Sequence, residues 1–327
     1  MKKVLVTGAT GFIGFELAHQ LAERGLRPRL MVRRPSRAPL FASVDAELIQ
    51  GDLRSDTSLQ RAVEGVDTVF HLGARATFEP YKRLVDTNLR GSENLMKTAL
   101  QAGVQRFVFA SSLFVHGSQS EPIDASTEPR PALGYGRAKW EAEQSLAALC
   151  DGTNMRLASI RLPHVYGPQS LLFRQIRSGL AIFPGTMLNR YTHLHVADAA
   201  RVLIAAAESN WTGSSAVGDD DPVDWVEFFG VLQAHYPRFR LLRLPAWLGH
   251  LGAAVASPFV RLRGKPTMYT NGTVTGFNLE LPVARRLLWS DLGIEPRFRS
   301  VHEGIPAALD GSLHFRWRNP VFDGGNQ

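Results

Sequence analysis

Several features are scarce in this sequence, and each scarcity excludes a class of protein. Cys150 is the one cysteine among 327 residues, so no intramolecular disulfide can form and a reducing compartment is expected. No apolar stretch reaches the ~20 residues that a membrane-spanning helix needs. We therefore expect a cytoplasmic protein that does not cross a bilayer.

The charge and the metal-ligating residues are also limited. A formal charge of +7 is modest for this length, so no nucleic-acid partner is expected. His193 and His195 would share one face of a strand, but no further group of cysteine, histidine or carboxylate residues completes a metal site. We expect no metal.

Apolar runs and helical patterns alternate through the first half of the chain. Helix-like segments cover 12–24, 58–63, 81–102 and 134–149. The strand candidates are Lys3–Thr7, Pro28–Val32, Ala46–Gln50, Thr68–His71, Arg106–Ala110 and Met155–Arg161. This alternation predicts an α/β fold with a doubly wound parallel sheet of the Rossmann type, whose ligands bind at the carboxyl ends of the strands.

The pattern becomes irregular after about Tyr166, where prolines divide the chain into short pieces. We expect residues 1–165 to form a Rossmann domain, with 193–210 returning to it. Residues 166–327 are expected to form a smaller, irregular α/β region that binds mainly the substrate.

Three glycines follow the first predicted strand and lead into a helix. Gly8 lies where the strand must turn, Gly11 lets the main chain approach an anion, and Gly14 lets the helix pack closely on the sheet. The N–H groups at the helix start would then face a pyrophosphate. The spacing G-x-x-G-x-x-G in this context predicts a dinucleotide site.

The end of the second strand indicates which dinucleotide binds. A carboxylate there would bind the ribose hydroxyls of NAD, whereas arginine favours the 2′-phosphate of NADP. The sequence has Arg33 and Arg34 at this place, so NADP is expected and NAD is the less favoured alternative. Asp52, after the third strand, is a candidate for the adenine amino group.

A tyrosine and a lysine lie one turn apart on a predicted helix. A nearby ammonium would favour the phenolate of Tyr135, so Lys139 is expected to lower the pKa of this phenol toward a working range. Ser112, at the end of a strand, would offer a hydroxyl to the same substrate oxygen. These three residues predict proton transfer to or from a substrate oxygen.

With these residues in place, the sequence resembles an extended short-chain dehydrogenase/reductase of the NAD-dependent epimerase/dehydratase superfamily over nearly its whole length. The matching pieces are TGATGFIG, GDL at 51–53, HLGA at 71–74, TNLRGSENL at 87–95, SSLFVHG at 111–117, YGRAK and RLPHVYGP at 161–168.

The resemblance implies two sets of site residues. Ser112, Tyr135 and Lys139 would be catalytic, with Asn88 on a helix beside the active site. The implied cofactor contacts are Thr7, Gly8, Thr10, Gly11, Phe12, Ile13, Gly14, Arg33, Arg34, Asp52, Leu53, Leu72, Gly73, Ala74, Tyr135, Lys139, Pro163, His164 and Val165.

The branch of the family is indicated by two later stretches. Residues 244–252 are similar to a stretch of the 3β-hydroxysteroid dehydrogenase and dihydroflavonol reductase-like branches, which act on apolar ketones or alcohols. Arg190 lies one place out of register with the segment that nucleotide-sugar epimerases use on phosphates. We therefore expect an NADP-dependent oxidoreductase for a hydrophobic small molecule. A nucleotide-sugar epimerase or dehydratase is the first alternative, and a non-catalytic dinucleotide sensor is the second.

Residues 244–260 contain no charged residue, and basic residues flank them on both sides. Trp247, Leu248, Leu251 and Val255 would share one helical face. Three roles stay open: a core helix, a lid over an apolar substrate, or a helix in weak contact with a membrane surface. A homodimer is also left open.

Overall fold

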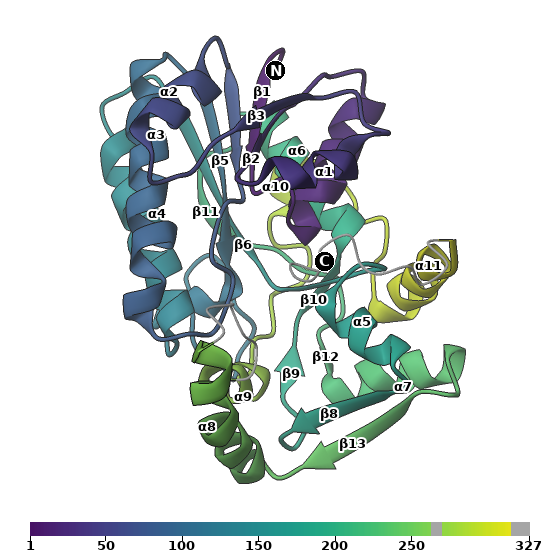
Figure 1. Cartoon of the computed structure of the whole chain (residues 1–327). Coiled ribbons are helices and arrows are strands. Elements are labelled where there is room, and N and C mark those ends of the chain that lie inside the picture. The colour runs from purple at the N-terminus through teal and green to yellow at the C-terminus, as the bar shows by residue number, and fades with distance from the viewer. Residues whose placement is uncertain (263–269, 315–327) are drawn as a thin grey trace.

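A computed structural model of the chain describes residues 1–262 and 270–314 (Figure 1). Parallel strands form the central sheet in this part of the chain. They are β1 (Val4–Thr7), β2 (Arg29–Val32), β3 (Glu47–Gln50), β4 (Thr68–His71), β5 (Arg106–Ser112), β6 (Arg156–Leu162) and β11 (Gly213–Ala216).

The strand order is β11-β6-β5-β4-β1-β2-β3, which confirms the predicted doubly wound sheet. Side chains along β1 alternate between two separate cores: Val4 and Val6 pack on one face of the sheet, and Leu5 packs on the other. Helices cover both faces of the inner strands β1, β4 and β5, whose residues are all buried and mostly apolar in sequence.

Two helical layers cover the sheet. On one face lie α1 (Phe12–Glu23) and α6 (Val196–Glu208), which pack against each other. The other face carries α2 (Asp56–Val63), α3 (Gly91–Gln101) and α4 (Gly134–Cys150). Thus α6 and β11, which come late in the chain, join the layers begun by its N-terminal half.

The single helix predicted over 81–102 is wrong. The structure has a 3₁₀ turn at Tyr81–Arg83, a π-helical turn at Asp86–Arg90 and then α3. The wider π turn places Asn88 in the interior, where its side chain bonds to the main chain of Arg75. Helical periodicity alone does not show such an insertion.

Two further 3₁₀ segments cover Pro35–Phe41 and Leu113–Val115.

Short two-stranded sheets follow the Rossmann strands. β7 (His164–Tyr166) pairs with β10 (His193–His195), β9 (Arg190–Tyr191) with β12 (Val223–Asp224), and β8 (Leu180–Pro184) with β13 (Arg240–Leu244). The helices of this part are α5 (Leu171–Arg177), α7 (Trp225–His235), α8 (Ala246–Leu262), α9 (Asn271–Phe277), α10 (Trp289–Leu292) and α11 (Val301–His314). An aromatic core that includes Trp225, Phe228 and Phe183 joins α5, α7, α9 and α11, whereas Trp289 of α10 belongs to the core around α1 and α6.

No helix among the described residues is long and apolar enough to span a bilayer. The basic residues Arg263 and Lys265, which flank α8 in the sequence, lie outside the described residues.

Candidate active site

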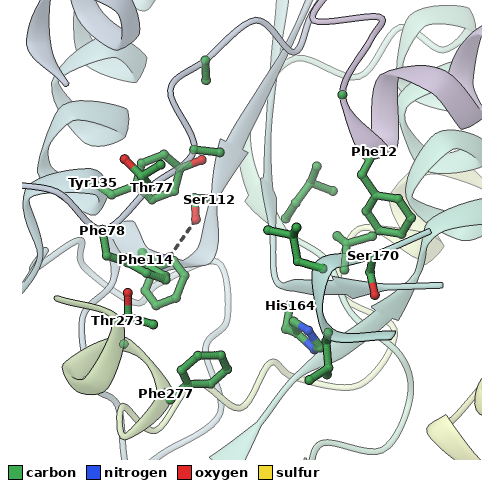
Figure 2. Close-up of a pocket in the computed structure, with 18 of the residues that line it drawn as sticks. Phe12, Thr77, Phe78, Ser112, Phe114, Tyr135, His164, Ser170, Thr273 and Phe277 are labelled. Carbon is green, nitrogen blue, oxygen red and sulfur yellow. Dashed lines mark hydrogen bonds between the residues drawn. The ribbon is translucent and has the colours of Figure 1, made fainter. Parts of the chain in front are cut away.

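A cavity of about 930 Å³ runs along the carboxyl ends of the central strands. The glycine turn after β1 lines one end, and α8 and α9 line the other. Figure 2 shows Ser112 and Tyr135 on one wall, His164 and Phe12 on the opposite wall, and a group of phenylalanines below them.

Most residues predicted to bind the cofactor line this cavity. They are Gly8, Thr10, Gly11, Phe12, Ile13, Gly14, Arg33, Asp52, Leu53, Leu72, Gly73, Ala74, Tyr135, Lys139, Pro163, His164 and Val165. Thr7, Arg34 and Asn88 are not among the lining residues.

The glycine turn has the shape that a dinucleotide requires. Gly8 adopts φ +70°, and a Cβ there would lie 2.6 Å from the main chain of Leu72. A Cβ on Gly14 would lie 2.3 Å from the carbonyl oxygen of Gly8, so α1 starts in direct contact with the turn. The N-cap of α1, Gly11, has no capping side chain. The first-turn backbone at the positive end of the helix dipole therefore faces the cavity, which fits a pyrophosphate.

Three charged side chains line the end of the cavity beyond β2 and β3. Arg33 and Asp52 were predicted, whereas Arg54 was not. Arg54 donates to both carboxylate oxygens of Asp52 at 2.9–3.0 Å, and this contact lowers the pKa of Asp52 to about 2. Arg33 is exposed and has no salt-bridge partner within the described residues. It is therefore the cation available here for a phosphate.

Ser112, Tyr135 and Lys139 come from two adjacent elements. Ser112 ends β5 and accepts a hydrogen bond from the N–H of Phe114 at 3.3 Å. Tyr135 and Lys139 lie one turn apart in the first part of α4. The Lys139 ammonium donates to the carbonyl of Ala110 at 2.7 Å and lies 4.4 Å from the centre of the Phe109 ring. All three side chains reach the same cavity.

The expectation that Lys139 lowers the pKa of Tyr135 is wrong for this structure. Burial raises the pKa of Tyr135 above its ordinary value, so the phenol stays protonated at neutral pH. Burial also lowers the pKa of Lys139 to about 7, although Glu143 opposes this change. The lysine is thus a weaker cation than the sequence implied, and its hydrogen bond goes to Ala110.

Buried polar side chains next to the cavity form hydrogen bonds that fix the segments around it. Glu143, one turn beyond Lys139, accepts from the Arg161 guanidinium at 2.8–3.2 Å. Thr7 contacts His71 at 2.7 Å and accepts from the N–H of Gly73 at 3.1 Å. Asn88 accepts from the Arg75 N–H at 2.7 Å, and so fixes the segment after β4. Thr7 and Asn88 therefore position the cavity wall without lining it.

The two histidines considered as metal ligands have other partners. His193 contacts His164 through the two Nδ1 atoms at 2.9 Å, inside the aromatic core. Burial lowers the pKa of His164 to about 4, so a neutral imidazole faces the cavity. His195 caps α6 by accepting from the N–H of Ala197. The described residues contain no group of three or more His, Cys, Asp or Glu side chains that could hold a metal ion.

The far half of the cavity is apolar and aromatic. The residues that line it belong to α5, β8, β9, α7, β13, α8, α9 and the segments around Phe78 and Phe114. None of these described lining residues is Asp, Glu, Lys or Arg. The rings are those of Phe78, Phe114, Phe183, Tyr191, Trp225, Phe229 and Phe277. Sequence spacing does not distinguish a cavity wall from a core, so Trp225 and Phe229 are placed here only by the structure. Arg190 is exposed and does not line the cavity.

Helix α8 has two apolar faces, which corrects the single face predicted for 244–260. Leu248, Gly249, Gly252 and Ala253 line the cavity. The side chains of Trp247, Leu251 and Val255 are exposed instead.

A family model described as the NAD dependent epimerase/dehydratase family matches residues 4–217, which is more than half of the chain. The chain therefore belongs to this family, and its resemblance to extended short-chain dehydrogenases/reductases is confirmed. The family comprises nicotinamide-dependent enzymes.

Two curated relatives align with almost the whole chain. A ceramide reductase of Caulobacter vibrioides is 28% identical over 324 residues, which cover 95% of this chain and 92% of that protein. A 3-beta-hydroxysteroid dehydrogenase of Mycolicibacterium neoaurum is 29% identical over 347 residues, with coverage of 94% and 92%. Among solved structures, MoeE5 in complex with UDP-glucose and NAD superimposes with a TM-score of 0.78 at 25% identity, covering 96% of this chain and 99% of that one.

Proposed function

We propose that the protein is an NADP-dependent oxidoreductase that transfers hydride between the nicotinamide and a carbonyl or secondary alcohol of a hydrophobic small molecule. The observation that carries this proposal is the far half of the cavity, whose described lining is mainly aromatic and aliphatic, with a few hydroxyl groups and no charged side chain. A nucleotide-sugar substrate would bring two phosphates into this half, whose described lining residues include no arginine or lysine. The names of the two curated relatives, one for a ceramide and one for a steroid, agree with an apolar substrate.

The proposal assigns proton transfer to Tyr135. Its protonated phenol donates to the carbonyl oxygen during reduction, and the phenolate accepts the proton during oxidation. Ser112 holds the same oxygen through its hydroxyl group. Lys139, whose pKa is about 7, exchanges protons near neutral pH from the next turn of α4. When bound, the nicotinamide supplies or accepts the hydride.

The cofactor preference rests on Arg33. This side chain lines the cavity at the end of β2, where a 2′-phosphate would lie. Both carboxylate oxygens of Asp52 already accept hydrogen bonds from Arg54. Arg33 thus recognises the additional phosphate, while the glycine turn and the start of α1 hold the pyrophosphate.

The decisive experiment measures NADPH oxidation against steroidal, long-chain and aromatic ketones, beside UDP-glucose. We expect net NADPH consumption with an apolar ketone and none with the sugar nucleotide. Cofactor that stays bound through purification, without net consumption, would instead support an epimerase. Binding of NADPH with no turnover of any substrate would support a sensor.

A matched pair of variants tests the role of the serine. Ser112→Ala should lower kcat by about 10²-fold, because a hydroxyl donor to the reacting oxygen is lost. Ser111→Ala removes the neighbouring hydroxyl, which is buried and has no hydrogen-bond partner among the described residues, and should leave kcat nearly unchanged. Equal effects of the two variants would contradict the assignment.

A further inference from the structure

Large apolar side chains are exposed together at one end of the molecule. They are Leu180 and Ile182 of β8, Leu242 of β13, and Trp247, Leu251 and Val255 of α8, each between 47% and 64% exposed. We call these six residues the apolar end face. Figure 1 shows β8, β13 and α8 at the end of the molecule remote from the N-terminus.

The three elements that carry this face adjoin one another. Ile182 and Leu242 lie opposite each other in the β8–β13 pair. Pro245 then connects β13 directly to α8, and a Cβ on Gly249 would lie 2.4 Å from the Pro184 side chain, so the helix packs tightly on β8. Trp247, Leu251 and Val255 follow a spacing of four residues along one side of α8. Monomeric soluble proteins rarely leave such a set of side chains in water, so this face is expected to be covered by a partner.

The charge around the face indicates the nature of that partner. The stretches 171–189 and 238–262, which build this end, contain no aspartate or glutamate. Three of their arginines, Arg238, Arg240 and Arg243, are exposed. A second copy of the chain would bring like charges together, whereas an anionic lipid surface is complementary to them. Aromatic and aliphatic residues beside arginines are also the composition of helices that lie in a membrane interface.

The apolar end face lies next to the apolar half of the cavity. The opposite side of α8, with Leu248 and Ala253, lines the apolar half of the cavity. Ile182, a member of the exposed face, also lines this cavity, so the face and the proposed substrate site adjoin along α8 and β8. An apolar molecule could therefore pass from a bilayer into the cavity past α8 with little exposure to water.

We propose that the apolar end face docks on the surface of an anionic bilayer, from which the hydrophobic substrate enters the cavity. The entry of substrate rests on the proposed function. The docking itself does not, and it can be tested with vesicles alone.

The test is sedimentation of the full-length protein with vesicles of phosphatidylglycerol and phosphatidylcholine, and with vesicles of phosphatidylcholine only. Wild type should sediment with the anionic vesicles. Trp247→Glu/Leu251→Glu should weaken this binding at least about tenfold. Leu48→Glu/Gln60→Glu adds the same charge at exposed positions of the Rossmann part and should bind like wild type. Because an arginine near an anionic surface strengthens binding about fivefold, Arg240→Gln/Arg243→Gln should weaken binding about 25-fold.

Thermal melting and NADPH affinity establish that each variant is folded. Tyr135→Phe should sediment like wild type although it is inactive, so failure of docking and failure of the proposed function are distinguishable. The proposal is overturned if wild type stays in the supernatant with anionic vesicles, or if the Trp247/Leu251 variant binds as well as the charge-matched control. It is also overturned if wild type is a dimer without lipid that this variant converts to a monomer, since a second copy then covers the face.

Discussion

Arg33 should carry the preference for NADPH over NADH, and Arg34 should not. Both arginines follow β2, but only Arg33 lines the cavity. A hydrogen bond to a charged group contributes about 1.5–3 kcal/mol, and the exposure of Arg33 points to the lower end of that range. We therefore expect Arg33→Ala to weaken NADPH binding about tenfold while NADH binding changes little.

The measurement is a titration of both cofactors with wild type, Arg33→Ala and Arg34→Ala. Arg34→Ala serves as the control, because it removes the same charge from the same loop. Higher salt should reduce the advantage of NADPH in wild type, since an exposed charge is screened. Equal affinities of wild type for the two cofactors would refute the reasoning, as would equal losses in the two variants.

Three further predictions follow from the geometry. Tyr135→Phe should lower kcat by about 10²–10⁴-fold with NADPH affinity retained; wild-type turnover in steady-state assays would contradict the proposed proton transfer. Gly14→Ala should lower the melting temperature and abolish cofactor binding, because its Cβ would lie 2.3 Å from the Gly8 oxygen. The control is Gly230→Ala in α7, where a Cβ meets nothing within 4 Å; this variant should raise the free energy of unfolding by about 0.5–1 kcal/mol. Burial lowers the pKa of His71 to about 3 and those of His116, His164 and His195 to about 4. Below pH 6.5 the unfolded chain therefore binds more protons than the folded protein, and the free energy of unfolding should fall by about 1.4 kcal/mol per pH unit for each of these histidines. Denaturant titrations measure this change, and an unchanged free energy of unfolding at pH 5.5 would contradict the burial of neutral histidines.

The sequence was sufficient to predict six strands of the Rossmann sheet, because the inner strands β1, β4 and β5 are buried and mostly apolar, whereas the short edge strand β11 has the sequence GSSA and was not predicted. Thr68–His71 matches β4 at both ends, and the other five predicted strands differ from the structure by one or two residues at their ends. The glycine turn was equally clear, since it combines three glycines with a strand before and a helix after them. These features depend on local sequence patterns.

The parts that were not predicted depend on contacts between distant segments. Arg54 approaches the cofactor end of the cavity through its bond to Asp52, which no motif indicates. The pKa of Tyr135 is governed by burial, whereas the sequence shows only that a lysine lies one turn away. Likewise, the helical spacing of α8 showed its apolar character but not which side chains face the cavity and which face water.

The late return of the chain to the central sheet sets the order in which the protein can fold during synthesis. Leu17 and Ile160 belong to a core that Ala199 and Leu203 of α6 complete, and β11 pairs with β6 along the edge of the sheet. Between the end of β6 at Leu162 and the end of β11 at Ala216 lie 54 residues of chain. At about 5–20 residues per second, a ribosome needs roughly 3–10 s to add them. During that interval the nascent sheet has one apolar face without its second helix and an unpaired edge strand, so chaperone binding to emerging chains should be concentrated there.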